Sequence, residues 1–164
     1  MGGRIARNFA LAHPERVKSL VLANTSPGFD ALPPERVSAF VEQRSRLDPQ
    51  AQARRLLGPG AHPEALERLV AGMRAVHRDS YLKTVQASVT QDLGAPIERI
   101  ALATLVIGSL DDPLYPIEIA RSMARRIPGA RLVELPGGHV SNLEQPERFN
   151  RAVLEFLNTV ETTS

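Results

Sequence analysis

The chain has 164 residues and a mass of 17.9 kDa, enough for one domain with a hydrophobic core. It contains no cysteine, which excludes disulfide bonds and thiolate metal sites, and its formal net charge at pH 7 is only +2. Arginines alternate with acidic residues rather than clustering, which argues against a nucleic-acid partner. The longest apolar run is far shorter than the roughly 20 residues of a membrane span, and the N-terminus lacks a signal-peptide pattern. We therefore expect a cytoplasmic protein without a membrane partner.

The N-terminal residues predict a helix, a strand and a loop. The helix is expected over residues 4–12, with Ile5 and Phe9 on its core-facing side and its arginines pointing away. Residues 19–23 form an apolar run too short for a helix, which is typical of a buried strand. Residues 24–28 are rich in turn-forming types and predict a loop.

The long segment over residues 29–94 has helical patterns and no strand pattern. Several of its expected helices begin at a proline, which lacks an amide hydrogen that the first turn does not use. Asp48 followed by Pro49, for example, predicts a capped helix start. The apolar stripes of these helices indicate packing against one another and against a sheet. The segment is therefore expected to be a helical insertion.

The C-terminal third alternates strands and helices. A β-branched run over residues 104–107 predicts a central strand that Gly108 ends, and a helix is expected over residues 117–127. Residues 131–135 alternate in polarity and predict an edge strand, and residues 147–157 predict a final helix. Strands that alternate with helices favour an α/β fold with a parallel sheet of about three strands.

Two residues that can carry chemistry, Asp112 and His139, each follow a predicted strand. Both would lie at the carboxyl edge of the parallel sheet, where open α/β folds place their sites. A carboxylate hydrogen-bonded to an imidazole orients the ring as a general base. The simpler alternative is that Asp112 caps the next helix and His139 is an ordinary loop residue. A metal site of Asp111, Asp112 and His139 lacks evident third and fourth ligands, so no metal or cofactor is predicted.

Three sequence blocks resemble the α/β-hydrolase superfamily. Residues 108–116 (GSLDDPLYP) and residues 138–146 (GHVSNLEQP) are similar to that family's acid and histidine blocks. Residues 1–17 resemble the helix that follows its nucleophile elbow. The order of the blocks agrees with the family's triad, in which serine, acid and histidine follow one another. Within the superfamily the chain looks nearest to the 3-oxoadipate enol-lactonase and meta-cleavage-product hydrolase branch.

The resemblance implies a partial α/β-hydrolase fold. In this interpretation residues 1–28 and 95–164 form the core, with about three parallel strands flanked by helices. Residues 29–94 are similar in position and length to the family's helical cap, or lid, domain. Such a cap would shape an apolar pocket for a small-molecule substrate.

The resemblance also implies roles for individual residues. His139 would be the general base, Asp112 would orient it, and the backbone amide of Met1 would belong to the oxyanion hole. Gly2 and Gly3 match the last two glycines of the elbow motif Gly-x-Ser-x-Gly-Gly, so the nucleophilic serine would stand just before residue 1. The implied parent enzyme cleaves an ester, a lactone or an activated carbon–carbon bond.

None of the serines in the chain fits the nucleophile's position. Ser26 lacks the flanking glycines of an elbow, and Ser109 and Ser141 lie near the acid and the histidine but not on a strand–helix turn. Loss of the nucleophile costs about 10⁶ in turnover in a comparable triad. We therefore expect a truncated chain with an incomplete catalytic triad, inactive by itself.

A non-catalytic interaction module, or a pseudogene product derived from the fold, is the alternative. Without further strands, residues 20–23 would form an exposed apolar sheet edge, which favours an oligomer or a protein partner. An in-frame Gly-x-Ser in the DNA upstream of Met1 would support the hydrolase interpretation. A stop codon there would support the alternative.

Overall fold

The computed structural model describes residues 1–28, 33–90 and 96–161. Within these ranges the chain forms three strands, eight α-helices and two short 3-10 helices. The strands are β1 (Ser19–Ala23), β2 (Ala103–Ser109) and β3 (Arg131–Leu135). The α-helices are α1 (Gly2–Ala12), α2 (Pro34–Ser45), α3 (Pro49–Leu56), α4 (Pro63–Ala75), α5 (Arg78–Thr90), α6 (Ile117–Arg126), α7 (Ser141–Glu144) and α8 (Pro146–Glu161). The 3-10 helices are Pro14–Arg16 and Ile97–Arg99.

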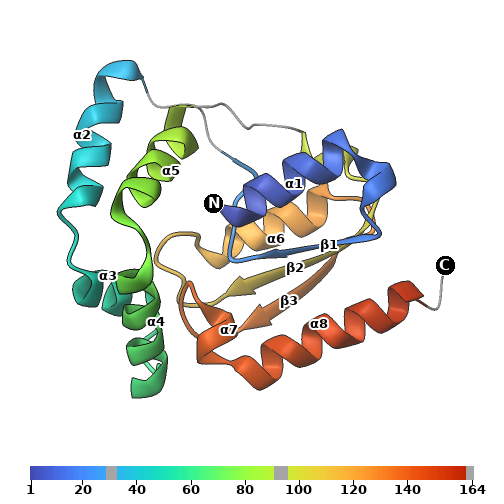
Figure 1. Cartoon of the computed structure of the whole chain (residues 1–164). Coiled ribbons are helices and arrows are strands. Elements are labelled where there is room, and N and C mark those ends of the chain that lie inside the picture. Colours follow the sequence, from blue (N-terminus) through green and yellow to red (C-terminus); the bar gives the residue numbers. More distant parts are fainter. Residues whose placement is uncertain (29–32, 91–95, 162–164) are drawn as a thin grey trace.

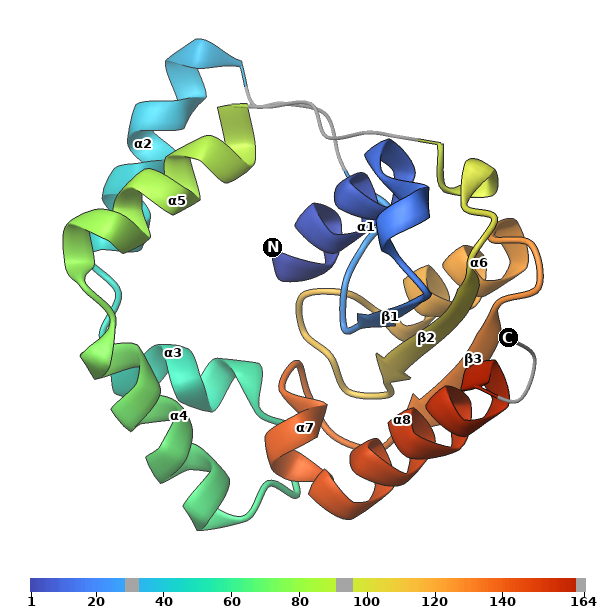
Figure 2. The same cartoon turned by 45° about the vertical axis from the view of Figure 1, so that its right-hand side comes forward.

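The strands form one parallel sheet in the order β1-β2-β3. Helices α1 and α6 cover one face of the sheet, and α8 covers the other (Figure 1). Helices α2 to α5, which we call the helical insertion, stand beyond the carboxyl ends of the strands, with α7 at the junction (Figure 2). The predicted α/β class and the parallel three-stranded sheet are confirmed.

The hydrophobic core lies on both faces of the sheet because β1 alternates its side chains between them. Leu20 and Leu22 are buried on the face of α1 and α6, whereas Val21 and Ala23 pack toward α8. The first cluster contains Ala10, Leu20, Leu22, Ile97, Ile100, Val106, Ala120, Met123 and Ile127. The second contains Leu105, Ile107, Leu135 and Phe156.

The prediction that Gly108 ends the central strand was wrong, because β2 continues to Ser109. A Cβ atom at Gly108 would lie 2.6 Å from Cβ of Ala120 and 2.7 Å from Cδ1 of Ile117. The absence of a side chain therefore lets α6 approach the strand closely.

The predicted orientation of the N-terminal helix was wrong. Ile5 and Phe9 are 57% and 42% exposed, whereas Arg4 and Arg7 are buried. Helical periodicity defines the two faces of α1 but does not say which one meets the sheet. Here the arginines lie on the buried face, where their aliphatic stems can pack, and Arg4 donates a hydrogen bond to the backbone oxygen of Ser88 in α5.

The helix boundaries follow local chemistry. The Asp48 carboxylate accepts a hydrogen bond of 2.8 Å from the amide of Ala51, which confirms the predicted cap of α3. Helix α8 runs to Glu161, four residues beyond its predicted end at position 157.

Among the described residues, no helix has the length and apolar character needed to cross a bilayer.

Candidate active site

The structure brings Asp112 and His139 together at the carboxyl edge of the sheet. Nδ1 of His139 lies 2.9 Å from Oδ2 of Asp112. The Asp112 side chain is fully buried, and the His139 side chain is 21% exposed. The loops that carry them are tied by a backbone bond from the Asp111 amide to the Gly137 oxygen, at 3.0 Å. The two residues therefore form a defined pair, reachable from solvent on the imidazole side.

The environment of Asp112 favours its ionised form. Burial alone would raise the pKa of this carboxyl, but hydrogen bonds from His139 and from the amides of Leu114 and Tyr115 outweigh it and lower the pKa. The two amides donate to Oδ1 at 2.8 and 3.1 Å, which leaves Oδ2 for the imidazole. Asp112 thus holds the loop before α6, but it does not cap that helix as the simpler interpretation predicted, because the N-cap residue of α6 is Pro116.

The ionised carboxylate sets the tautomer of His139. A carboxylate can only accept hydrogen bonds, so Nδ1 must carry a hydrogen and Nε2 of the neutral ring has a free lone pair. In the described part of the chain, Nε2 has no hydrogen-bond partner. The Tyr115 ring packs beside the imidazole, with its centroid 5.7 Å away. This arrangement can accept a proton at Nε2 and stabilise the resulting imidazolium.

His139 and Met1 line the same cavity, of about 270 Å³. Met1 is the N-cap residue of α1, so the first amides of the helix point toward this end without helical partners. Burial and the charge of Arg4 lower the pKa of the Met1 amino group. The structure therefore places the predicted oxyanion residue in the cavity of the predicted base.

Asn24, which follows β1 directly, organises the site, and sequence reasoning missed it. Its backbone has φ 45°, in the left-handed region. Its side-chain amide donates to Ser109 Oγ at 2.7 Å and to Asp112 Oδ2 at 3.2 Å. Ser141 Oγ donates to its side-chain oxygen at 2.6 Å. A polar residue directly after a strand, at the same sheet edge as Asp112, was the available signal.

No serine near the site is hydrogen-bonded to the imidazole in the described part of the chain. Ser109 and Ser141 are buried, and both hydroxyls are bonded to Asn24. Ser26 is also buried, and it lines a separate cavity beside Leu114 and Tyr115. None of these hydroxyls is hydrogen-bonded to His139 within the ranges that the structure describes.

The helical insertion is locked to the histidine loop through Glu144. The two carboxylate oxygens of Glu144 accept hydrogen bonds from the amides of Gly58 and Gly138, at 2.7 and 2.8 Å. The amide of His139 donates to the Leu56 oxygen at 2.7 Å. The end of α3 therefore fixes the backbone that carries the imidazole.

A metal centre is not evident here. Over residues 1–28, 33–90 and 96–161, no group of three or more histidine and acidic side chains could hold a metal ion.

A protein-family model described as "alpha/beta hydrolase fold" matches residues 1–146 of the sequence. The chain belongs to the α/β-hydrolase fold family. The resemblance identified in the sequence is confirmed, and Asp112 and His139 lie within the matched residues.

Several hydrolases of this family are similar to the chain in sequence or structure. The 3-oxoadipate enol-lactonase 2 of Acinetobacter baylyi is 29% identical over 158 residues, which cover 93% of this chain and 59% of the relative. The 2-hydroxy-6-oxononadienedioate/2-hydroxy-6-oxononatrienedioate hydrolase of Burkholderia vietnamiensis is 32% identical over 173 residues, covering 96% and 59%. A thermophilic esterase from Thermogutta terrifontis superposes with a TM-score of 0.84 at 26% identity, covering 97% and 62%. The chain therefore spans about 60% of the length of these α/β-hydrolase relatives.

The lowered pKa of Asp112 predicts that this α/β-hydrolase chain loses stability in acid. The ionised carboxylate stabilises the fold above its ordinary pKa of 3.8, and that contribution disappears as the pH falls through the lower folded value. Urea titrations from about pH 6 to about pH 3 should therefore show the free-energy difference between the wild type and Asp112→Asn shrinking. The neighbouring Asp111→Asn provides the control, because it makes the same chemical change at an exposed position. A difference that stays constant with pH would contradict this linkage.

Proposed function

We propose that this chain carries the acid and the base of a serine-dependent hydrolase that cleaves an ester, a lactone or an activated carbon–carbon bond. His139 would take the proton of the attacking hydroxyl at Nε2, Asp112 would hold the ring, and the Met1 amide would stabilise the developing oxyanion. The attacking serine, in this proposal, belongs to a segment outside the 164 residues. The chain alone would then be inactive.

The 2.9 Å contact between Asp112 and His139 carries this proposal. The free Nε2, the shared cavity with Met1 and the absence of a bonded serine among the described residues are consistent with it. The names of the relatives, an enol-lactonase and an esterase among them, support the ester and lactone classes of substrate.

The helical insertion would act as the cap over the substrate. It stands at the edge of the sheet where His139 lies, and Glu144 ties it to the histidine loop. In this role it would exclude water and shape the pocket.

The tautomer of His139 offers a direct test on the 164-residue chain. We expect nitrogen-15 NMR of the neutral ring to report hydrogen on Nδ1 and none on Nε2, because ionised Asp112 accepts from Nδ1. The Asp112→Asn variant should lose this preference. Hydrogen on Nε2 in the wild type would exclude His139 as a base in this geometry.

The upstream DNA and an activity assay test the missing nucleophile. We expect an in-frame Gly-x-Ser before the codon of Met1, and a chain extended through it should hydrolyse p-nitrophenyl acetate. The 164-residue chain should not exceed free imidazole in the same assay. An upstream stop codon, or hydrolysis by the short chain that is lost in His139→Ala, would contradict the proposal.

A non-catalytic interaction module is the second candidate, because α1 presents an apolar surface. Met1, Ile5 and Phe9 are 47%, 57% and 42% exposed. Strand β1 lies at the edge of the described sheet and pairs there only with β2. An oligomer formed through this edge would appear as a multiple of 17.9 kDa in light scattering. An upstream stop codon together with such an oligomer would favour this function.

A further inference from the structure

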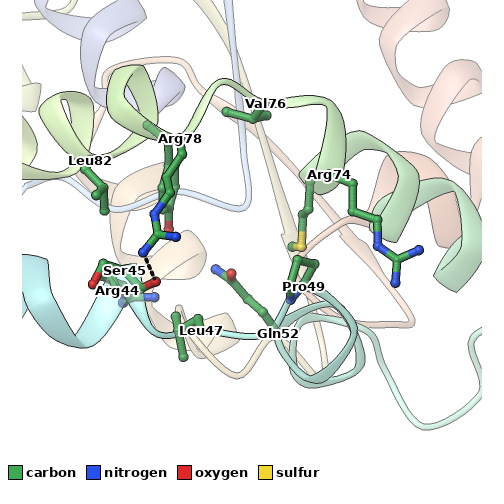
Figure 3. A pocket seen from close by; sticks show the side chains of 11 residues that line it. Arg44, Ser45, Leu47, Pro49, Gln52, Arg74, Val76, Arg78 and Leu82 are labelled. Atoms are coloured by element: carbon green, nitrogen blue, oxygen red, sulfur yellow. Dashed lines mark hydrogen bonds between the residues drawn. The ribbon is translucent and has the colours of Figure 1, made fainter.

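A cavity in the helical insertion lies apart from the Asp112–His139 site. The cavity has a volume of about 420 Å³, which is within the usual range for small-molecule sites. It lies where the end of α2, the start of α3, the end of α4 and the start of α5 meet (Figure 3). No described residue lines both this cavity and the cavity of His139.

The lining of this cavity combines apolar walls with positive charge. Among the described residues that line it, three are arginines and none is aspartate or glutamate. Leu47, Met73, Val76 and Leu82 supply apolar surface. An occupant that matches this lining has an apolar body and an anionic group.

The arginines are available to an anion. Among the described residues, Arg44, Arg74 and Arg78 form no ion pair, whereas Arg46 and Arg68 of the same insertion are paired with Glu42 and Glu64. Arg and Lys also outnumber Asp and Glu over residues 34–90. None of these three arginines is therefore already paired with a carboxylate in the described part of the chain.

Arg78 is already oriented toward the space inside the cavity. Its guanidinium donates to the Ser45 oxygen at 3.0 Å, which leaves the remaining N–H donors free. The Gln52 amide points toward the same space from α3, whereas Arg74 extends away from it (Figure 3). A guanidinium and an amide facing one space can donate together to the two oxygens of a carboxylate.

We propose that the cavity binds a carboxylate with an apolar chain or ring, held at its charged end by Arg78 and Gln52. The apolar part lies against Leu47, Met73 and Leu82. This site is separate from the proposed catalytic pair, so its occupancy does not depend on the nucleophile.

Calorimetric titration of the 164-residue chain tests the proposal with three probes. Octanoate, below its micelle concentration, has both the charge and the chain, octanol has only the chain, and acetate has only the charge. We expect octanoate to bind more tightly than either. Equal binding of octanol or of acetate, or no binding of octanoate, would overturn the proposal.

Matched arginine variants locate the site. Arg78→Gln should weaken octanoate binding about tenfold, the loss expected for one charge-assisted hydrogen bond. Arg68→Gln should leave it unchanged, because Arg68 is exposed and paired with Glu64 at 3.1 Å. Amide NMR shifts should appear at Gln52 and Tyr81. Unchanged affinity in Arg78→Gln, or shifts centred on His139 instead, would overturn the assignment.

Discussion

In a chain extended upstream through Gly-x-Ser, His139→Ala is expected to lower kcat for p-nitrophenyl acetate by about 10⁶. This loss corresponds to about 8 kcal/mol of barrier, because the serine would then have no group to take its proton. Asp112→Asn should cost about 10⁴, since the asparagine amide can donate a hydrogen bond and so favours the wrong tautomer of His139. Initial rates measured with the three purified proteins give both ratios.

The controls separate the role of His139 from a general loss of structure. His13 is exposed at the end of α1, so His13→Ala should keep the full kcat. Circular dichroism of each variant confirms that it is folded. A His139→Ala variant that is folded and retains more than about a tenth of the activity would exclude the general-base role, because an intact triad depends on its histidine far more strongly.

The sequence was sufficient where a local pattern decides the structure. The apolar runs at residues 19–23 and 104–107 are too short for helices, so both could be assigned as strands. Asp112 follows the strand at residues 104–107, and His139 follows the strand at residues 131–135. Because parallel strands end at the same edge of a sheet, these positions predicted that the two side chains would lie close together. The observed distance of 2.9 Å between Nδ1 of His139 and Oδ2 of Asp112 agrees with this prediction.

The sequence was insufficient where the structure depends on a distant partner. The period of α1 gives two candidate faces, and only the packed sheet shows that Arg4 and Arg7 lie on the buried one. Gly108 resembles a strand breaker, yet the contact with α6 explains it. Asn24 and Glu144 each join segments more than 80 residues apart. The position of Asn24 after β1 indicates the sheet edge but not its partners, and no local pattern indicates the contacts of Glu144.

The histidine loop is held from three sides, which links the position of the insertion to the proposed base. The amide of Asp111, in the loop after β2, donates a hydrogen bond to the Gly137 oxygen. The side-chain amide of Asn24 donates to the Gly138 oxygen at 3.4 Å. At the end of α3, the Leu56 oxygen accepts a hydrogen bond from the His139 amide. A displacement of α3 would therefore move the imidazole backbone itself. If the insertion acts as a cap, its movement and the geometry of the base are mechanically coupled.

Gly138→Ala is expected to disrupt this junction and to destabilise the chain by about 3 kcal/mol. A Cβ atom at Gly138 would lie 2.4 Å from the Leu56 oxygen and 2.6 Å from the Gly58 nitrogen. Both atoms belong to backbone, so they cannot move aside as the end of a flexible side chain can. For a chain of this size the loss corresponds to roughly 10 °C in Tm.

A second glycine provides the matched control for this substitution. Gly72 lies within α4, and a Cβ atom there has nothing within 4 Å. Gly72→Ala should therefore stabilise the chain by about 1 kcal/mol, because alanine loses less backbone entropy in a helix. Hydrogen exchange at the Gly58 amide should quicken in Gly138→Ala, since the hydrogen bond to Glu144 would be strained, and should stay unchanged in Gly72→Ala. A Gly138→Ala variant with wild-type Tm and wild-type exchange at Gly58 would mean that the insertion is not held at this contact, and the coupling between the insertion and His139 would then have no structural basis.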